Sequence, residues 1–276
     1  MDIVSAVILG LIQGIAEFLP ISSSAHLALA HNIFGLTSPD SGSNITFDVL
    51  LHLGTLIAVF IVYRKDILDL IRSFFSLCKK VFTGKCKFRE LSANEKFVIY
   101  ILIATLPLLV AVLFNDYVEA LSGYSKVIGG ILIFNGIVLL LSDRLGSGIR
   151  GIEETKPRNA LIVGLCQMCA VVPGLSRSGS TITGGLFQGF RRDYAVKFSF
   201  ILSIPAILGA NILKVKDVIE TGATAAEWGI YALGAAVAAL SGIAAMKFLI
   251  FISKKANFTY FAYYCFIVGL LAIIFG

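Results

Sequence analysis

The sequence predicts an all-α polytopic membrane protein, built as an inverted-topology repeat with six transmembrane helices and two re-entrant helical hairpins. Hydrophobic residues make up 57% of the 276 residues and charged residues only 14%, a composition that soluble domains of this length do not have. Long apolar segments alternate with two apolar regions that a proline interrupts. We therefore expect a single membrane domain that comprises residues 1–276.

The six expected transmembrane helices are apolar segments long enough to cross a hydrocarbon core of about 30 Å. They cover residues 47–63, 97–114, 126–142, 195–213, 229–253 and 257–276. Two further apolar regions, 2–35 and 159–190, are interrupted at Pro20 and Pro173 and then turn through serine-rich sequence. Proline breaks a continuous helix, and neither half of these regions can span a bilayer alone. We predict that both are re-entrant hairpins whose tips are buried in protein or line a wet cavity.

Basic residues set the expected orientation. Most of the 23 lysines and arginines lie within residues 64–96 and 143–158 or close to residues 191–197 and 247–255, and residues 1–46 contain none. Cytoplasmic loops are enriched in Lys and Arg, so we expect a multi-pass plasma-membrane protein whose basic loops are cytoplasmic and whose first hairpin enters from outside. The same bias accounts for the net charge of +6, and nucleic-acid binding is not expected.

The two halves of the chain, about 1–142 and 159–276, are expected to be repeats that begin on opposite sides of the membrane. Each consists of one hairpin and three spans, and the cytoplasmic loops lie at about 64–96 and 143–158. A weak sequence echo at an offset of 154 residues supports the repeat, with the pairs Gly10 and Gly164, Gln13 and Gln167, Ser22 and Ser176, and Ser24 and Ser178. Inverted repeats with broken helices place a binding site near the midplane, where half-helix N-termini meet.

Glu17 is an ionisable residue inside the apolar segment IQGIAEFL. A charge at such a position costs about 2.5–3.5 kcal/mol on insertion scales, and intramembrane carboxylates are therefore functional candidates. Gln13 precedes Glu17 by four residues and points from the same helix face. We expect the pair to line a polar cavity and to hold a divalent cation or water. A carboxylate that is merely neutralised by a buried partner is the alternative.

The first hairpin tip continues from Pro20 through Ser22, Ser23 and Ser24 to His26. Ser22 or Ser23 can cap the second half-helix, whose free N–H groups and dipole form an anion site. His26 falls in the first turn of that helix, where it can act as a general acid or base. The alternative is a simple serine cap beside a structural histidine.

The second hairpin tip carries Arg177 between Ser176 and Ser178, with Thr181 one turn later. A buried arginine, a helix N-terminus and several hydroxyls suit a phosphate better than a neutral ligand. The segment is neither a P-loop nor a nucleophile elbow, because their sequence patterns are absent. The two tips together predict a phosphate or diphosphate site, and the apolar surroundings suggest that the rest of the substrate is lipid. The alternative is that Arg177 merely neutralises the charge of Glu17, a pairing that does not exclude a functional role.

At these residues the chain resembles the undecaprenyl-diphosphate phosphatase family, also called the bacitracin-resistance proteins. The resemblance covers essentially the whole chain and is most specific from Gln13 to His26 and from Pro173 to Gly179. It implies a diphosphatase that depends on a divalent cation, Mg²⁺ or Ca²⁺, and makes undecaprenyl phosphate for cell-envelope polymers at an outward-facing site. The residues that it assigns to the site are Glu17, Ser23, His26, Ser176, Arg177 and Thr181. Many members have Glu where this chain has Gln13, so one carboxylate is missing from any metal site here.

The chemistry of these groups suggests a division of roles. Arg177 and the two helix N-termini would hold the diphosphate, while Glu17 would position the cation. Further substrate contacts are expected from Gln13, Ser22, Ser24, Ser176, Ser178 and Thr181. The nucleophile stays open among Ser23 activated by His26, His26 itself, and a metal-bound water.

Two further questions stay open in the sequence. A transporter or scramblase of phosphorylated lipids is the main functional alternative, because inverted repeats with broken helices are a transporter architecture. Glycine-rich helices indicate close packing, which could serve a homodimer or only the fold of one chain.

Overall fold

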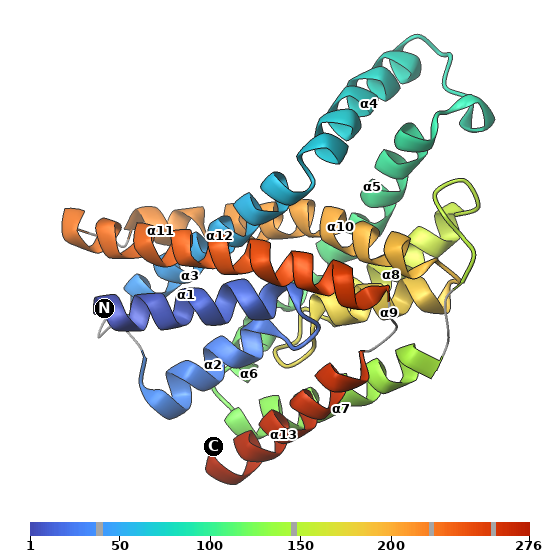
Figure 1. The fold of residues 1–276 in the computed structure, drawn as a ribbon. Coiled ribbons are helices and arrows are strands. Elements are labelled where there is room, and N and C mark those ends of the chain that lie inside the picture. Colours follow the sequence, from blue (N-terminus) through green and yellow to red (C-terminus); the bar gives the residue numbers. More distant parts are fainter. Residues whose placement is uncertain (37–40, 145–147, 221–223, 255–257) are drawn as a thin grey trace.

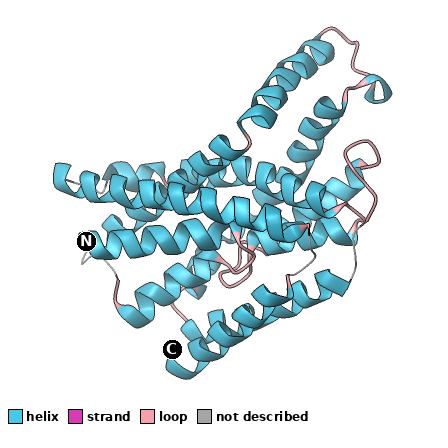
Figure 2. Cartoon of the chain, viewed as in Figure 1, coloured by secondary structure: helices cyan, strands magenta, loops and turns pink. Residues whose placement is uncertain are grey.

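The computed structural model of the chain is a bundle of helices (Figure 1). It describes residues 1–36, 41–144, 148–220, 224–254 and 258–276. In these ranges there is no β-strand, and the one β-type pairing is an isolated bridge between Arg150 and Phe190 (Figure 2). The all-helical class predicted from composition is confirmed for the described residues.

Among the described residues, five helices are long and apolar enough to cross a membrane. They are α3 (Ser41–Val62), α5 (Ala93–Ala111, followed by the 3-10 turn η2 at Val112–Phe114), α7 (Ser125–Arg144), α10 (Arg192–Leu213) and α12 (Ala225–Ser253). They correspond to five of the six predicted spans, with ends that differ by a few residues. The sixth prediction falls on α13 (Thr259–Phe275), which has 17 residues. At 1.5 Å per residue it is about 25 Å long, somewhat short of a core of about 30 Å.

The two proline-interrupted regions form broken helices, as predicted. The first consists of α1 (Ile3–Phe18) and α2 (Ser23–Phe34), and the second of α8 (Pro157–Cys169) and α9 (Arg177–Phe187). Serine side chains start the second helix of each pair, because Ser22 accepts the N–H of Ala25 and Ser176 accepts the N–H of Gly179. Such caps satisfy N–H groups that the first helical turn leaves free.

The segment 64–96, predicted as a cytoplasmic connection between two spans, is mostly helical. It contains α4 (Arg64–Phe82) and the 3-10 turn η1 (Phe88–Glu90), and α4 projects from the bundle with the start of α5 (Figure 1). The physical reason is an apolar face at helical spacing, on which Leu70 and Leu77 pack against Leu91 and Val98. The second predicted loop, 143–158, lacks regular helix from 148 to 156, whereas residues 145–147 lie outside the described residues.

Two short helices lie in the remaining connections between the long helices. They are α6 (Asn115–Leu121) and α11 (Val215–Glu220).

Close helix crossings join the two halves of the chain. Helix α1 packs along α12, α8 packs along α5, and α7 packs along α13. The echoed glycines lie at the first two crossings: a Cβ on Gly10 would be 2.6 Å from the Gly234 carbonyl oxygen, and one on Gly164 would be 2.5 Å from that of Ala104. Glycine is required there because only a bare backbone allows the helices to approach so closely. The broken helix of each half is thereby fixed against the second long helix of the other half.

Candidate active site

The breaks of the two hairpins meet at one buried amide. Asn135, which is fully buried on α7, donates its Nδ2–H to the Pro20 carbonyl oxygen at 3.0 Å. Its Oδ1 accepts the backbone N–H of Ser176 at 3.1 Å. A direct bond adds to this clamp, since the Ser178 hydroxyl donates to the Leu19 carbonyl oxygen at 3.2 Å. The starts of α2 and α9 are thus held beside each other.

Glu17 is the centre of the polar cluster. The Nε2–H of Gln13 donates to its Oε2 at 3.0 Å, and the Ser23 hydroxyl donates to the same oxygen at 2.6 Å. Arg177 donates from Nη2 to Oε1 in an ion pair that crosses from one hairpin to the other. The structure therefore brings together Gln13, Glu17, Ser23 and Arg177, as the sequence predicted.

The cluster also contains His52 on α3. Its Nε2 lies 4.0 Å from Glu17 Oε2, while its Nδ1–H donates to the Asp48 carbonyl oxygen at 2.8 Å. A carbonyl oxygen can only accept, so the proton of a neutral imidazole is on Nδ1 and the lone pair of Nε2 is directed toward the cluster.

Two atoms of the cluster have no hydrogen-bond partner among the described residues, although both are buried. They are Arg177 Nη1 and Gln13 Oε1. Glu17 is 8% exposed and Gln13 is fully buried. Buried polar atoms normally find partners in protein or ordered water. One free cationic donor and one free amide oxygen beside a buried ion pair are suited to a polar ligand with several oxygens.

The start of α2 is strained as well as polar. Ser22 has φ 71° and ψ 98°, the only positive φ of a described residue other than glycine. Residues of this kind cluster at functional sites, where the surrounding structure enforces them. Ser22 is buried, with its hydroxyl 3.2 Å from that of the exposed Ser24.

The start of α9 is held by its own hydroxyls. Ser176 and Ser178 lie 3.1 Å apart through their Oγ atoms, and Thr181 donates to the Arg177 carbonyl oxygen at 2.8 Å. Thr181 also lies 2.6 Å from the hydroxyl of Ser199 on α10. Ser176, Ser178 and Thr181 are each 1% exposed, so in this structure these three predicted substrate contacts hold the turn that carries Arg177.

His26 lies on α2 and faces α13. Its Nδ1–H donates to the Ser22 carbonyl oxygen at 2.7 Å, and its Nε2 lies 2.8 Å from the Tyr264 hydroxyl, which therefore donates to it. The two rings are stacked, with centroids 5.5 Å apart. Among the described hydrogen bonds none joins His26 to Ser23, whose hydroxyl is directed to Glu17.

Three functional candidates were missed from the sequence. Asn135 carried a signal, because an amide in an apolar span is unusual. Tyr264 and Ser199 carried none, because their importance depends on which helices pack together.

The cluster offers few ligands for the divalent cation that the resemblance implies. The described residues contain no group of three or more Asp, Glu, His or Cys side chains suited to a metal ion. Glu17 and the free Oε1 of Gln13 are oxygen ligands of the kind that Mg²⁺ and Ca²⁺ prefer, and Mg²⁺ commonly binds one or two carboxylates together with substrate phosphates. The residues fit a cation whose coordination the substrate completes, and they do not form a complete site by themselves.

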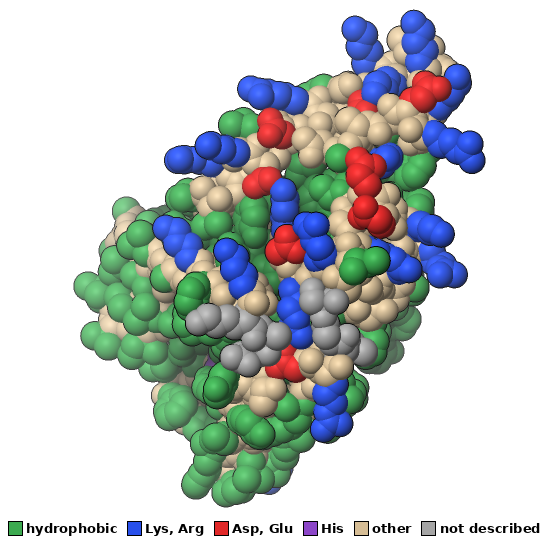
Figure 3. Space-filling view, turned by 45° about the vertical axis from the view of Figure 1, so that its right-hand side comes forward, with side chains coloured by type: hydrophobic (Ala, Val, Ile, Leu, Met, Phe, Trp, Pro, Cys, Tyr) green, Lys and Arg blue, Asp and Glu red, His purple; other side chains and the backbone are tan. Residues whose placement is uncertain are grey.

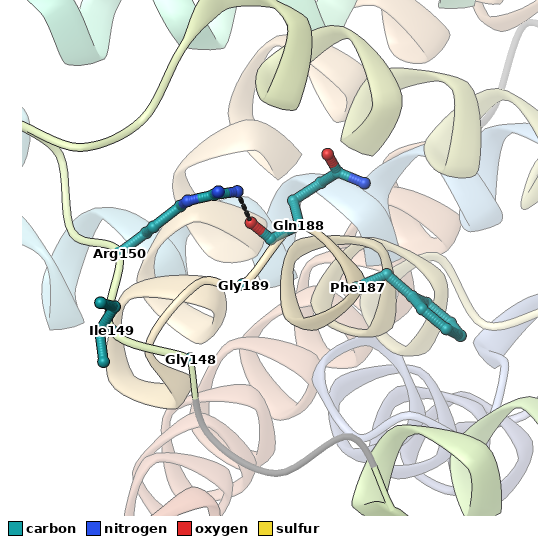
Figure 4. Close-up of a pocket in the computed structure, with 6 residues that line it drawn as sticks. All are labelled: Gly148, Ile149, Arg150, Phe187, Gln188 and Gly189. Atoms are coloured by element: carbon teal, nitrogen blue, oxygen red, sulfur yellow. Dashed lines mark hydrogen bonds between the residues drawn. The ribbon is translucent and has the colours of Figure 1, made fainter.

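A separate hollow lies at the other end of α9 (Figure 4). It is lined by Gly148, Ile149, Arg150, Phe187, Gln188 and Gly189. Arg150 there donates from Nη1 to the Gln188 carbonyl oxygen, which joins the 148–156 loop to the end of α9. None of the predicted site residues lines it.

The whole chain, including both hairpin breaks, is similar to known proteins. The sequence profile of the family described as bacitracin resistance protein BacA matches residues 6–271. The undecaprenyl-diphosphatase of Halothermothrix orenii is 41% identical over 99% of this chain and 98% of its own length. Those of Methanobrevibacter smithii and Alkaliphilus metalliredigens are 41% and 39% identical, over 98% and 100% of this chain and 96% and 99% of their own lengths.

Proposed function

The chain belongs to the bacitracin resistance protein BacA family, and we propose that it hydrolyses undecaprenyl diphosphate to undecaprenyl phosphate and inorganic phosphate. This reaction recycles the lipid carrier for cell-envelope polymers. The observation that carries the proposal is the convergence of the Ser23 hydroxyl and the Arg177 guanidinium on Glu17. A proton acceptor, a hydroxyl nucleophile and a phosphate-binding cation are the groups that phosphoryl transfer through an enzyme hydroxyl needs. The names of the three relatives agree with this activity.

The diphosphate is bound by charge and by helix N-termini. Arg177 offers its free Nη1, and the N–H groups at the starts of α2 and α9 converge with it because Asn135 holds the two breaks together. The isoprenoid chain stays in the bilayer, next to the apolar outer surfaces of the long helices. Ser176, Ser178 and Thr181 position Arg177.

Ser23 is the nucleophile of this proposal. Its oxygen bonds to the terminal phosphorus, the bond from that phosphorus to the bridging oxygen breaks, and undecaprenyl phosphate leaves. Glu17 Oε2, which accepts the Ser23 hydroxyl at 2.6 Å, takes the proton. Water then attacks the phosphoserine, and Glu17 returns the proton to Ser23 Oγ. One proton of that water stays on the released phosphate and the other passes to solvent.

His26 has a different part, because its Nε2 accepts from Tyr264 and not from Ser23. Its Nδ1–H donates to the Ser22 carbonyl oxygen, so both ring nitrogens are engaged and His26 orients the first turn of α2, whose N–H groups bind the phosphate. His26 itself and a metal-bound water are the rival nucleophiles, and the experiment below separates them from Ser23.

We propose that Mg²⁺ or Ca²⁺ is required, held by Glu17 and the Oε1 of Gln13. When bound, such a cation neutralises charge on the phosphate oxygens.

The proposed topology has six membrane spans, two re-entrant hairpins and an outward-facing site. Repeat one covers about 1–142 and repeat two about 159–276. The matching crossings of α1 with α12 and of α8 with α5 support the repeat. The basic ends of α7 and α10 and the basic α4 support a cytoplasmic location for that face of the molecule.

The test measures phosphate release from undecaprenyl diphosphate by the purified protein in detergent, with Mg²⁺, Ca²⁺ or chelator. Glu17→Gln, Ser23→Ala and Arg177→Ala are each expected to lower the rate by about a thousandfold or more. Ser142→Ala is the matched control, since this buried serine donates only within its own helix and should change the rate by less than about twofold.

Rapid quenching should trap phosphate on Ser23 of the wild type. Phosphate trapped on His26 would move the nucleophile there, and no trapped phosphate with full turnover of Ser23→Ala would indicate water. Absence of phosphate release from folded wild type under all three conditions would refute the enzyme and favour lipid transport.

A further inference from the structure

Helix α4 carries an exposed apolar row that no other part of the described structure covers. Leu68, Ile71, Phe75 and Phe82 are 54%, 46%, 67% and 91% exposed. Their spacing of three, four and seven residues places them on one side of the helix. The opposite edge of the apolar face is already used, because Leu70 and Leu77 pack against the start of α5. The exposed row is therefore additional to the residues that attach α4 to the bundle.

A basic row runs beside the apolar one. Lys65, Arg72 and Lys79 are spaced seven residues apart, and each lies three residues before a member of the apolar row. Lys65 and Lys79 have no ion-pair partner among the described residues, and Arg72 has only an exposed contact of 3.5 Å with Asp69. Lysine and arginine gather over the upper part of the molecule, which includes this projecting arm (Figure 3). The helix therefore presents apolar and cationic side chains side by side on one exposed surface.

The start of α4 is fixed close to the ends of membrane-crossing helices. Only Tyr63 separates it from α3, and Asp66 forms an ion pair with Lys197 near the start of α10. Helix α4 thus begins beside one end of α3 and of α10, two of the helices long and apolar enough to cross a membrane, and such helix ends lie near the headgroups of a bilayer. Its 19 residues extend about 28 Å from that point.

A lipid surface explains this pattern better than a second copy of the chain. Helices that lie in the membrane interface combine an apolar face with Lys and Arg at its border, and anionic headgroups attract those charges. Two copies of α4 that paired through Leu68, Phe75 and Phe82 would bring two rows of Lys and Arg together without an acidic row to match them, which opposes pairing.

We propose that α4 lies in the headgroup region of the adjacent leaflet and binds anionic phospholipid. The apolar row contacts the upper acyl chains, and the basic row contacts phosphate groups. The inference is independent of the phosphatase chemistry, because none of these residues belongs to the polar cluster at Glu17.

The experiment uses the full chain in nanodiscs and reads the depth of single tryptophans. Trp228, the only tryptophan, is replaced by Phe, and a new tryptophan is introduced as Phe75→Trp or as Ser73→Trp. Position 73 is the matched control, since it lies about 160° round the helix from position 75. Quenching by lipids brominated on the upper acyl chain is then compared between phosphatidylcholine and phosphatidylglycerol bilayers.

Quenching is expected to be strong at position 75, weak at position 73, and greater in phosphatidylglycerol. Replacing Arg72 and Lys79 with Gln should raise the phosphatidylglycerol content needed for half-maximal quenching by about threefold. Equal quenching at both positions, or none at position 75, would overturn the proposal. So would loss of quenching at position 75 as a second protein copy is loaded into each disc, because that result assigns the row to self-association. Phosphate release by the same variants is measured separately, so failure of one proposal does not obscure the other.

Discussion

Replacing Asn135 with Ala is expected to separate the two hairpin breaks and to damage both stability and activity. The side chain donates to the Pro20 carbonyl oxygen and accepts from the Ser176 N–H. Alanine removes both bonds and adds no new partner.

The expected loss of stability follows from the two backbone groups that the substitution leaves buried without a hydrogen-bond partner. A buried group without a partner costs about 1–3 kcal/mol, so the pair corresponds to about 2–6 kcal/mol. Hydrogen bonds between membrane helices average only about 0.6 kcal/mol where the freed groups find other partners. Pro20 and Ser176 lie in helix breaks, and Asn135 is the hydrogen-bond partner described for each of these two groups. The larger range therefore applies.

The assay combines thermal unfolding in detergent with phosphate release. A lower unfolding midpoint is expected, together with a loss of activity of about a hundredfold at temperatures where the variant is folded, since a displacement near 1 Å can cost that much. Asn211→Ala is the control, because Asn211 is buried on α10 and its Nδ2 has no partner among the described residues. Equal effects of the two substitutions would refute the view that Asn135 acts as a clamp.

Three further substitutions test separate features. Arg177→Lys keeps the positive charge but loses the planar guanidinium. In the phosphate-release assay kcat/KM is expected to fall by about a hundredfold. Activity within about twofold of wild type would mean that charge alone suffices. Tyr264→Phe removes the hydroxyl that donates to His26, so kcat should fall by about tenfold with an unchanged unfolding midpoint, whereas a lower midpoint would indicate a structural role. Gly14→Ala should lower the unfolding midpoint by several degrees, because its Cβ would lie 2.0 Å from a side-chain oxygen of α12. Gly130→Ala should leave the midpoint unchanged, because its Cβ would meet no atom within 4 Å. Equal midpoints of the two variants would contradict the close crossing.

The elements that the sequence predicted well depend on local signals. Pro20 and Pro173 interrupt their apolar regions through steric effects within the chain, and the structure breaks its helices at both places. The segment that contains α4 was predicted only as a cytoplasmic connection, because its charges exclude a membrane span. Its helical form depends on the contact of Leu70 and Leu77 with α5, which is a tertiary interaction.

The same division applies to the site. Gln13 and Glu17 were paired correctly because a spacing of four residues defines a helix face. The contact of Glu17 with Arg177 crosses 160 positions of sequence, and only the repeat suggested it. No local pattern could bring Asn135 or Tyr264 to the hairpin tips, because α7 and α13 reach them through helix packing.

The ion pair between Glu17 and Arg177 implies an order of events in the proposed reaction. A buried ion pair contributes little to stability relative to apolar residues, so its presence is better explained by function. A carboxylate beside a guanidinium is a weak proton acceptor. Glu17 therefore becomes a better base for Ser23 when a diphosphate draws Arg177 away, and the charge of any cation held by Glu17 would be shared with the diphosphate oxygens in the same way. An uncharged phosphorylating reagent cannot do so, and it should modify Ser23 faster in Arg177→Ala than in the wild type. Slower modification of the variant would show that Arg177 activates Ser23 directly.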